Sequence, residues 1–134
     1  MNDEILLTIP ARQSMLLVAR MALSGFCAQC GADVDTLDDV RTACDEACYC
    51  LMHQRRQALQ LHIRASFDGE YVHVCFEAER GAPVDGTAKH DPEIARGILS
   101  LLACQVELDY DADGPWRIQL QVCPSFPAGG GHER

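Results

Sequence analysis

Cysteines are the most prominent residues of chemical potential in this sequence, with eight in 134 positions. Cys27 and Cys30 are separated by two residues, a spacing that can bind zinc or support thiol exchange. Zinc takes about four ligands, and no second such pair accompanies these two. Cys44 and Cys48 share one face of an expected helix, whereas Cys50 turns away. We therefore interpret the cysteines as small packing residues and expect no bound metal.

Histidines and serines give no further candidate site. The serines sit in no nucleophile motif. The histidines show no clustered ligand spacing, and we interpret these four as structural: His53, His62, His73 and His90.

The charge balance limits the classes of partner. Lys and Arg number 11 against 20 Asp and Glu, a net charge of −9 that would repel a phosphate backbone. Nucleic acid is therefore excluded as an expected partner. No apolar run approaches the roughly 18 residues of a membrane helix, and residues 2–4 are polar and acidic instead of basic. We expect a cytoplasmic chain with reduced thiols and no membrane partner.

The length suits a single domain, and 48% hydrophobic residues are enough to form a core. We place that domain at residues 1–123. Residues 124–134 contain three consecutive glycines and are expected to form a flexible C-terminal tail.

The first half of the chain predicts one strand and two helices. Apolar residues alternate over 5–9, which predicts a strand. Over 11–31 they recur every three or four residues, as in a long amphipathic helix. Asp35 or Thr36 is expected to cap a second helix that runs to about His53.

The second half predicts two hairpins around a third helix. Residues 59–66 and 71–76 alternate in hydrophobicity on either side of a turn at Asp68 and Gly69. A second alternating pair surrounds a turn over 111–114. Between the hairpins, residues 78–90 are expected to form a loop that leads into a helix.

The third helix should begin at Asp91 and Pro92, which supply a cap and a first-turn proline. Its expected core face comprises Ile94, Ile98, Leu101 and Leu102. The full order is β-α-α-β-β-α-β-β. We predict an α+β fold, a two-layer sandwich with a mostly antiparallel five-stranded sheet and three helices on one face.

Three segments of the sequence resemble one known family. They are residues 39–50, the phrase over 9–12 and the helical stretch over 18–25. All three are similar to the bacterial anti-sigma factor serine/threonine kinases, small members of the GHKL superfamily with the histidine kinase-like ATPase fold. The resemblance extends over residues 5–122, and its element order agrees with the pattern above.

The resemblance implies roles for two residues of the second helix. The family's Glu-Ala-Cys-Thr-Asn segment places a general base at Glu46 and a magnesium-binding asparagine at the position of Cys50. A spacing of four keeps both on one helical face. A thiol is a poor partner for magnesium, which prefers hard oxygen ligands. The base is therefore retained and the metal ligand is replaced.

The family's glycine motifs are also altered. Its Asp-x-Gly-x-Gly box, which binds adenine, aligns with Glu77, Glu79 and Gly81, so one glycine is kept. Its phosphate-cradling Gly-Leu-Gly aligns with Glu93 and Ala95. Side chains and negative charge at these positions oppose close approach of a nucleotide.

The altered motifs favour one of two functions. We expect an anti-sigma-factor-like regulator that binds a sigma factor or an anti-sigma factor antagonist, with an impaired ATP site and no cofactor. The alternative is an active serine/threonine kinase that uses ATP and magnesium to phosphorylate the antagonist. The sequence leaves homodimer formation open.

Overall fold

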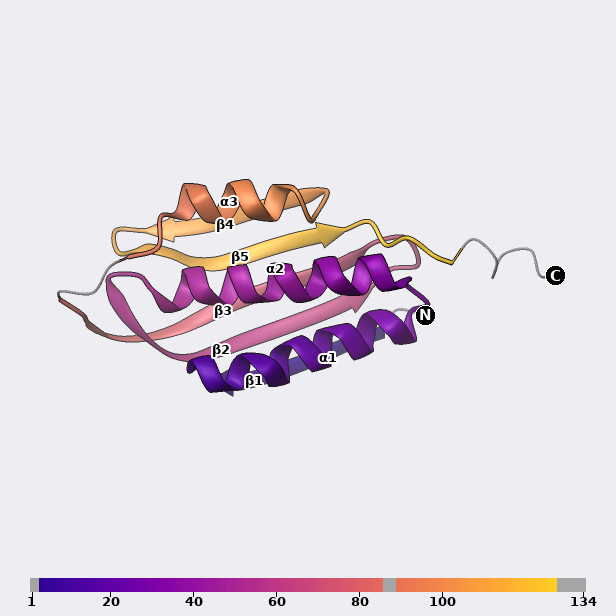
Figure 1. The fold of residues 1–134 in the computed structure, drawn as a ribbon. Coiled ribbons are helices and arrows are strands. Elements are labelled where there is room, and N and C mark those ends of the chain that lie inside the picture. Colours follow the sequence, from indigo (N-terminus) through magenta and orange to yellow (C-terminus); the bar gives the residue numbers. More distant parts are fainter. Residues whose placement is uncertain (1–2, 86–88, 128–134) are drawn as a thin grey trace.

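The computed structural model describes residues 3–85 and 89–127, which form a sheet and a layer of helices. The elements are β1 (Asp3–Pro10), a 3₁₀ turn (Gln13–Met15), α1 (Leu16–Gln29), α2 (Val34–Met52), β2 (Arg56–Phe67), β3 (Val72–Pro83), α3 (Pro92–Ser100), β4 (Gln105–Asp111) and β5 (Gly114–Val122). This order confirms the predicted one. Figure 1 shows α1, α2 and α3 on the same side of the sheet.

The sheet has the strand order β1-β2-β3-β5-β4, and each neighbouring pair is antiparallel. Both hairpins turn where the sequence predicted. Gly69 and Gly114 adopt φ values of +97° and +109°, which side chains with a Cβ rarely adopt. The two-layer α+β fold with a five-stranded sheet is thus confirmed.

Helix α2 occupies the middle of the helix layer. It contacts α1 on one flank, α3 on the other and the sheet beneath, so an unusually wide arc of its surface is buried. Small residues line that arc: Ala43, Cys44, Ala47, Cys48 and Cys50. Cys50 was expected to turn away from the packed face, but α3 covers that flank as well. None of the described helices is both long and apolar enough to cross a membrane.

Two boundaries differ from the sequence prediction. Asp33, instead of Asp35 or Thr36, caps α2, and its side chain accepts the Thr36 N–H at 3.0 Å. Strand β3 continues to Pro83, because β2 offers a partner along its whole length, with register shifts near Ala58. The loop before α3 is therefore shorter than the predicted 78–90.

The buried face of α3 differs in part from the one predicted: Leu102 packs against the core as expected, but Ile94 and Leu101 do not. Ala95 and Leu99 are fully buried, whereas Ile94 is 54% and Leu101 is 85% exposed. The helix lies at the edge of the layer against α2 and β4, where a small residue permits close approach to α2. The buried face of the helix itself therefore comprises one small and one large residue, Ala95 and Leu99.

The chain continues in contact with the domain after β5. The Ser125 N–H donates to Thr36 Oγ1 at 2.9 Å, and the Ser125 carbonyl accepts the Asp33 N–H at 2.8 Å. These bonds hold the start of the predicted tail against the first turn of α2. The rest of that tail, residues 128–134, lies outside the described residues.

We predict that Thr36→Val will lower the free energy of unfolding by about 1–2 kcal/mol, because the substitution keeps the shape of a buried side chain but leaves the Ser125 N–H without its acceptor. Urea denaturation measures the change. Thr42→Val is the matched control, since its exposed hydroxyl bonds only to the Asp38 carbonyl of its own helix. Equal effects of the two substitutions would contradict the role of Ser125.

Candidate functional site

The sequence-predicted base, Glu46, lies on α2 where that helix meets the start of α3. Its Oε2 is 2.6 Å from Nε2 of His90, and the two side chains are 16% and 17% exposed. A carboxylate only accepts hydrogen bonds, so His90 donates through Nε2. The carboxylate that would receive a proton from an incoming hydroxyl is therefore already paired.

His90 is held in this position through its backbone. Its N–H donates to the His53 carbonyl at 2.9 Å, and its carbonyl accepts Nε2 of Gln54 at 3.0 Å. The same Gln54 amide donates to the Cys50 carbonyl at 2.8 Å. The ring of Tyr49 meets His90 edge-on at 5.1 Å between centroids. Residues at and just after the end of α2 therefore hold His90 in place beside Glu46.

Cys50 lies one helical turn from Glu46 and is fully buried. Burial is the main cause that raises the pKa of its thiol to about 12, with further contributions from the nearby carboxylates of Glu46 and Asp91. The Gln54 amide, which is 3.7 Å from the sulfur, has the opposite effect. Cys50 is therefore a neutral packing thiol near neutral pH.

The start of α3 is closed by its own capping interactions. Asp91 Oδ1 accepts the Glu93 N–H at 2.9 Å, and the Asp91 carbonyl accepts the N–H groups of Ile94 and Ala95 at 3.1 and 3.3 Å. Pro92 has no N–H to offer. The backbone amides that the start of a helix could present to a phosphate are therefore already hydrogen-bonded within α3. The carboxylates of Asp91 and Glu93 lie at the same helix start.

We call Glu46, Cys50, His90, Asp91 and Ala95 the α2–α3 seam. It brings together three of the sequence-predicted site residues, namely Glu46, Cys50 and Ala95. His90 was interpreted as structural, and no spacing signal connects it to Glu46, because 44 positions separate them. Asp91 was identified only as a helix cap. The seam joins groups that chain order keeps apart.

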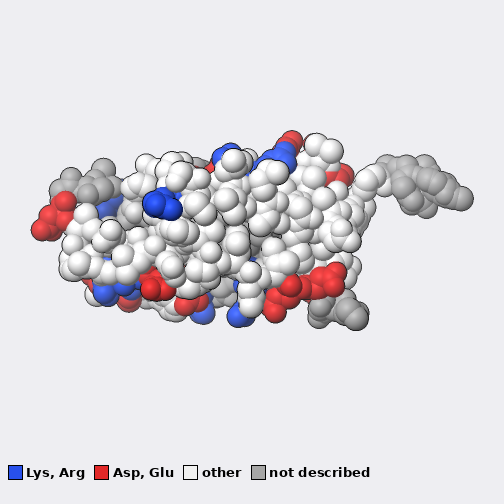
Figure 2. All heavy atoms as spheres, turned by 90° about the horizontal axis from the view of Figure 1, so that it is seen from below, with Lys and Arg blue, Asp and Glu red and all other residues white. Residues whose placement is uncertain are grey.

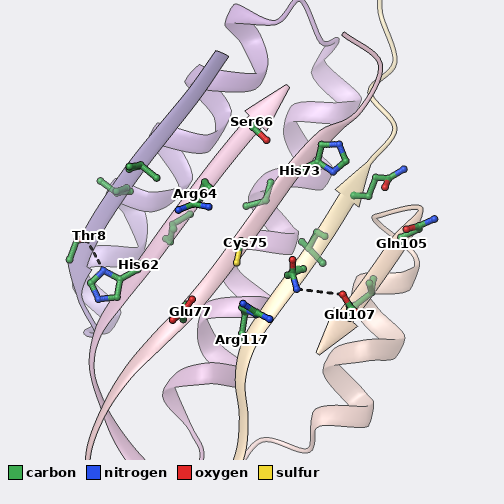
Figure 3. Close-up of a pocket in the computed structure, with 18 residues that line it drawn as sticks. Thr8, His62, Arg64, Ser66, His73, Cys75, Glu77, Gln105, Glu107 and Arg117 are labelled. Carbon is green, nitrogen blue, oxygen red and sulfur yellow. Dashed lines mark hydrogen bonds between the residues drawn. The ribbon is translucent and has the colours of Figure 1, made fainter. Parts of the chain in front are cut away.

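Glu77 lies on the other side of the sheet from the seam. Along β3 the buried residues Val74, Phe76 and Ala78 face the helices, so the odd-numbered positions face away. Figure 3 shows Glu77 beside Arg117 on the face opposite the helices. Ala78, instead of Glu77, is the residue that faces the helix layer at this level.

Gly81, near the end of β3, packs closely against the neighbouring strand. A Cβ at this position would lie 3.1 Å from the Leu59 side chain, and the Gly81 carbonyl accepts Nε of Arg56 at 2.8 Å. Both contacts are with the neighbouring strand β2. Gly81 therefore has a role in strand pairing that requires no nucleotide.

The face of the sheet without helices carries a cavity of about 870 Å³. Several polar groups along it already have partners within the protein. His62 lies 2.8 Å from Thr8 Oγ1 and 3.1 Å from Glu79, and Arg117 donates to Asp109 at 2.7 Å. This surface is separated from the seam by the sheet itself.

Within the described part of the chain, no group of three or more His, Cys, Asp or Glu side chains is placed to hold a metal ion. Burial and the neighbouring Cys30 raise the pKa of Cys27 to about 11, which disfavours a reactive thiolate. Cys104 and Cys123 depart from the packing interpretation, because both are exposed.

The architecture is similar to that of a solved structure, the RsbU and RsbW domains of Rv1364c from Mycobacterium tuberculosis. The TM-score is 0.72, with 17% sequence identity over 94% of this chain. The match covers 34% of that chain, so the present chain spans about a third of its length. At this identity the likeness establishes the fold. No family model matches the sequence, and no curated protein sequence matches it.

We predict that His90→Ala will lower the free energy of unfolding by about 1–2 kcal/mol, because Glu46 would lose a charge-assisted hydrogen bond in a mostly buried setting. A double-mutant cycle with Glu46→Gln, measured by urea denaturation, should give a coupling energy of similar size. His62→Ala provides the matched control, because its pair with Glu79 is about half exposed and should contribute less than about 1 kcal/mol. Additive effects of the His90 and Glu46 substitutions would contradict the pairing.

Proposed function

We propose that this chain is an anti-sigma-factor-like regulator that acts by binding a protein partner, with a nucleotide site too altered for phosphate transfer. The carrying observation is the closed start of α3, where the N–H groups of Glu93, Ile94 and Ala95 are all engaged by Asp91. Its fold, shared with a chain that includes an RsbW domain, supports the regulatory class.

Three features of the seam support the proposal that it does not transfer phosphate. A metal ion must neutralise charge on the phosphoryl group, but position 50 is a buried thiol. Backbone amides must hold the phosphates, but those of α3 are satisfied internally. The base must be available to the incoming hydroxyl, but His90 occupies Glu46. The last two features are interactions within the chain, so binding ATP would have to break them.

The outer surface of α1 supplies an apolar contact area for a partner. Leu17, Val18 and Met21 are 56%, 44% and 64% exposed, and Arg20 is the one charged residue of this helix. In Figure 2, which views the molecule from the side of α1 and β1, atoms of uncharged residues occupy most of the middle of the surface. Exposed apolar side chains that lie together on one helix are typical of a protein contact surface.

Asp45 of α2 borders that apolar area, and Asp38 and Asp39 lie about two turns nearer the start of the same helix. Asp45 pairs across the two helices with Arg20 at 3.3 Å, while Asp38 pairs with Arg41 and Asp39 is exposed. Together with the net charge of −9, they favour a partner with a basic surface. A sigma factor is the partner we propose, and an anti-sigma factor antagonist is the second candidate.

One observation supports the alternative of an active kinase. Glu46 retains the helical position of the family's base and lies beside the start of α3, where the phosphates would be held. Activity would then require His90 to move away from Glu46 and the N-terminal bonds of α3 to open when ATP and magnesium bind.

We predict that titration of magnesium-ATP into the purified protein, followed by calorimetry, will give no saturable binding, with a Kd of about 1 mM or weaker. The internal bonds at the seam are the reason. Micromolar binding would overturn the proposal and favour the kinase. In that case Glu46→Gln should abolish phosphate transfer to the antagonist while leaving ATP binding in place.

We predict that charge reversal of both Asp38 and Asp39 to Lys will slow association with the partner by about tenfold at low salt, because complementary charge steers encounter. The difference should shrink as salt screens the charges. Surface plasmon resonance with the partner recovered by pull-down measures the association rate of each protein at low and at high salt. Glu107→Lys, an exposed reversal on the strand face away from the helices, is the control.

Met21→Ser should act differently, by speeding dissociation, since it removes apolar contact area from α1. A pull-down that recovers neither a sigma factor nor an antagonist would count against the proposal. So would a partner whose association rate is indifferent to Asp38 and Asp39.

A further inference from the structure

The two exposed cysteines lie together at one end of the β4–β5 hairpin. Cys104 immediately precedes β4, and Cys123 immediately follows β5. The Cys104 N–H donates to the Gln121 carbonyl at 2.9 Å, and its thiol donates to the same oxygen at 3.0 Å. The hairpin register, which pairs Gln105 with Gln121, brings Cys104 and Cys123 next to each other across the two strand ends, and the neighbouring Cys104 raises the pKa of Cys123. Two thiols distant in sequence are thus held side by side at the surface.

The other six cysteines lack this combination of pairing and access. Cys27, Cys44, Cys48 and Cys50 have no exposed surface. Cys30 is partly exposed, but its nearest cysteine is the buried Cys27. Cys75 lies on the helix-free face of the sheet, where its thiol has charged neighbours such as Arg117 and Glu77. An oxidant in solution would therefore find one accessible thiol pair among the described residues.

A metal ion does not explain the pair. Zinc needs about four ligands, and no third His, Cys, Asp or Glu within the described residues joins these two thiols in a metal-binding group. Nor do the thiols have a packing role of the kind that explains Cys44 and Cys48, since both are exposed. Their proximity remains as the feature to be explained.

We propose that Cys104 and Cys123 form a reversible intrachain disulfide when the protein meets a small disulfide oxidant such as glutathione disulfide. One thiolate attacks the oxidant, breaks its sulfur–sulfur bond and forms a mixed disulfide, releasing the first glutathione thiol. The second cysteine then attacks that mixed disulfide and releases the second glutathione thiol. Two cysteine thiols are oxidised, one glutathione disulfide is reduced, and the two thiol protons end on the two glutathione molecules.

The bond would fasten the hairpin at the point where the chain leaves the sheet. Only Pro124 separates Cys123 from Ser125, whose backbone bonds to Thr36 and Asp33 at the start of α2. Oxidation would therefore tie the loop before β4 to the segment that secures α2. This site is independent of the proposed binding function, so either could fail alone.

Peptide mapping of the full-length protein tests the proposal directly. The folded protein is incubated with glutathione disulfide, remaining thiols are alkylated, and the denatured chain is digested with trypsin. Cleavage after Arg96 and Arg117 yields residues 97–117 and 118–134, each with a single cysteine. We expect these two peptides to appear covalently joined, with two hydrogen masses lost, and to separate after treatment with dithiothreitol.

Variants distinguish this bond from general oxidation. Cys104→Ser and Cys123→Ser should each abolish the joined peptide, whereas Cys75→Ser should leave its yield unchanged. The joined peptide should come from monomeric protein on a non-reducing gel. Persistent glutathione adducts on Cys104 or Cys123 without the joined peptide would overturn the proposal, as would a bond formed only between two chains.

Discussion

The burial of α2 on three sides is the constraint on which the rest of this structure depends. A helix between two other helices and a sheet must present small residues along most of its surface, and Ala43, Cys44, Ala47 and Cys48 meet that need. Small side chains bury less apolar volume than large ones, but they allow α3 to pack directly against α2. Most of the buried cysteines are explained by this requirement, because a thiol is a small and weakly polar packing group.

Close contact between α2 and α3 also determines the chemistry of the seam. The loop before α3 is drawn onto the end of α2 through His53 and Gln54, and it carries His90 to Glu46. Asp91 then satisfies the start of α3. In this arrangement the polar groups of the seam have their partners within the chain. A carboxylate in the position of a base is therefore compatible with a protein that acts by binding.

Local signals were enough to predict the fold, whereas the seam depends on contacts between distant segments. Alternation and turn glycines located both hairpins, and the spacing of apolar residues located the helices. The buried face of α3 was predicted only in part, because hydrophobicity favoured Ile94 and Leu101, whereas Ala95 and Leu99 are the residues buried in the helix. The pairing of Glu46 with His90 has no local signal. The orientation of Glu77 follows from the alternation of β3, which motif alignment did not consider.

Site-resolved NMR offers the most direct test of the proposal that internal bonds keep nucleotide from the start of α3. Backbone amide shifts are recorded while magnesium-ATP is added to the folded protein. The account predicts that the amides of Glu93, Ile94 and Ala95 will not shift in a saturable way, because Asp91 already holds them. Saturable shifts at these three amides, accompanied by a change at the His90 ring, would show that the seam opens to nucleotide and would contradict the account.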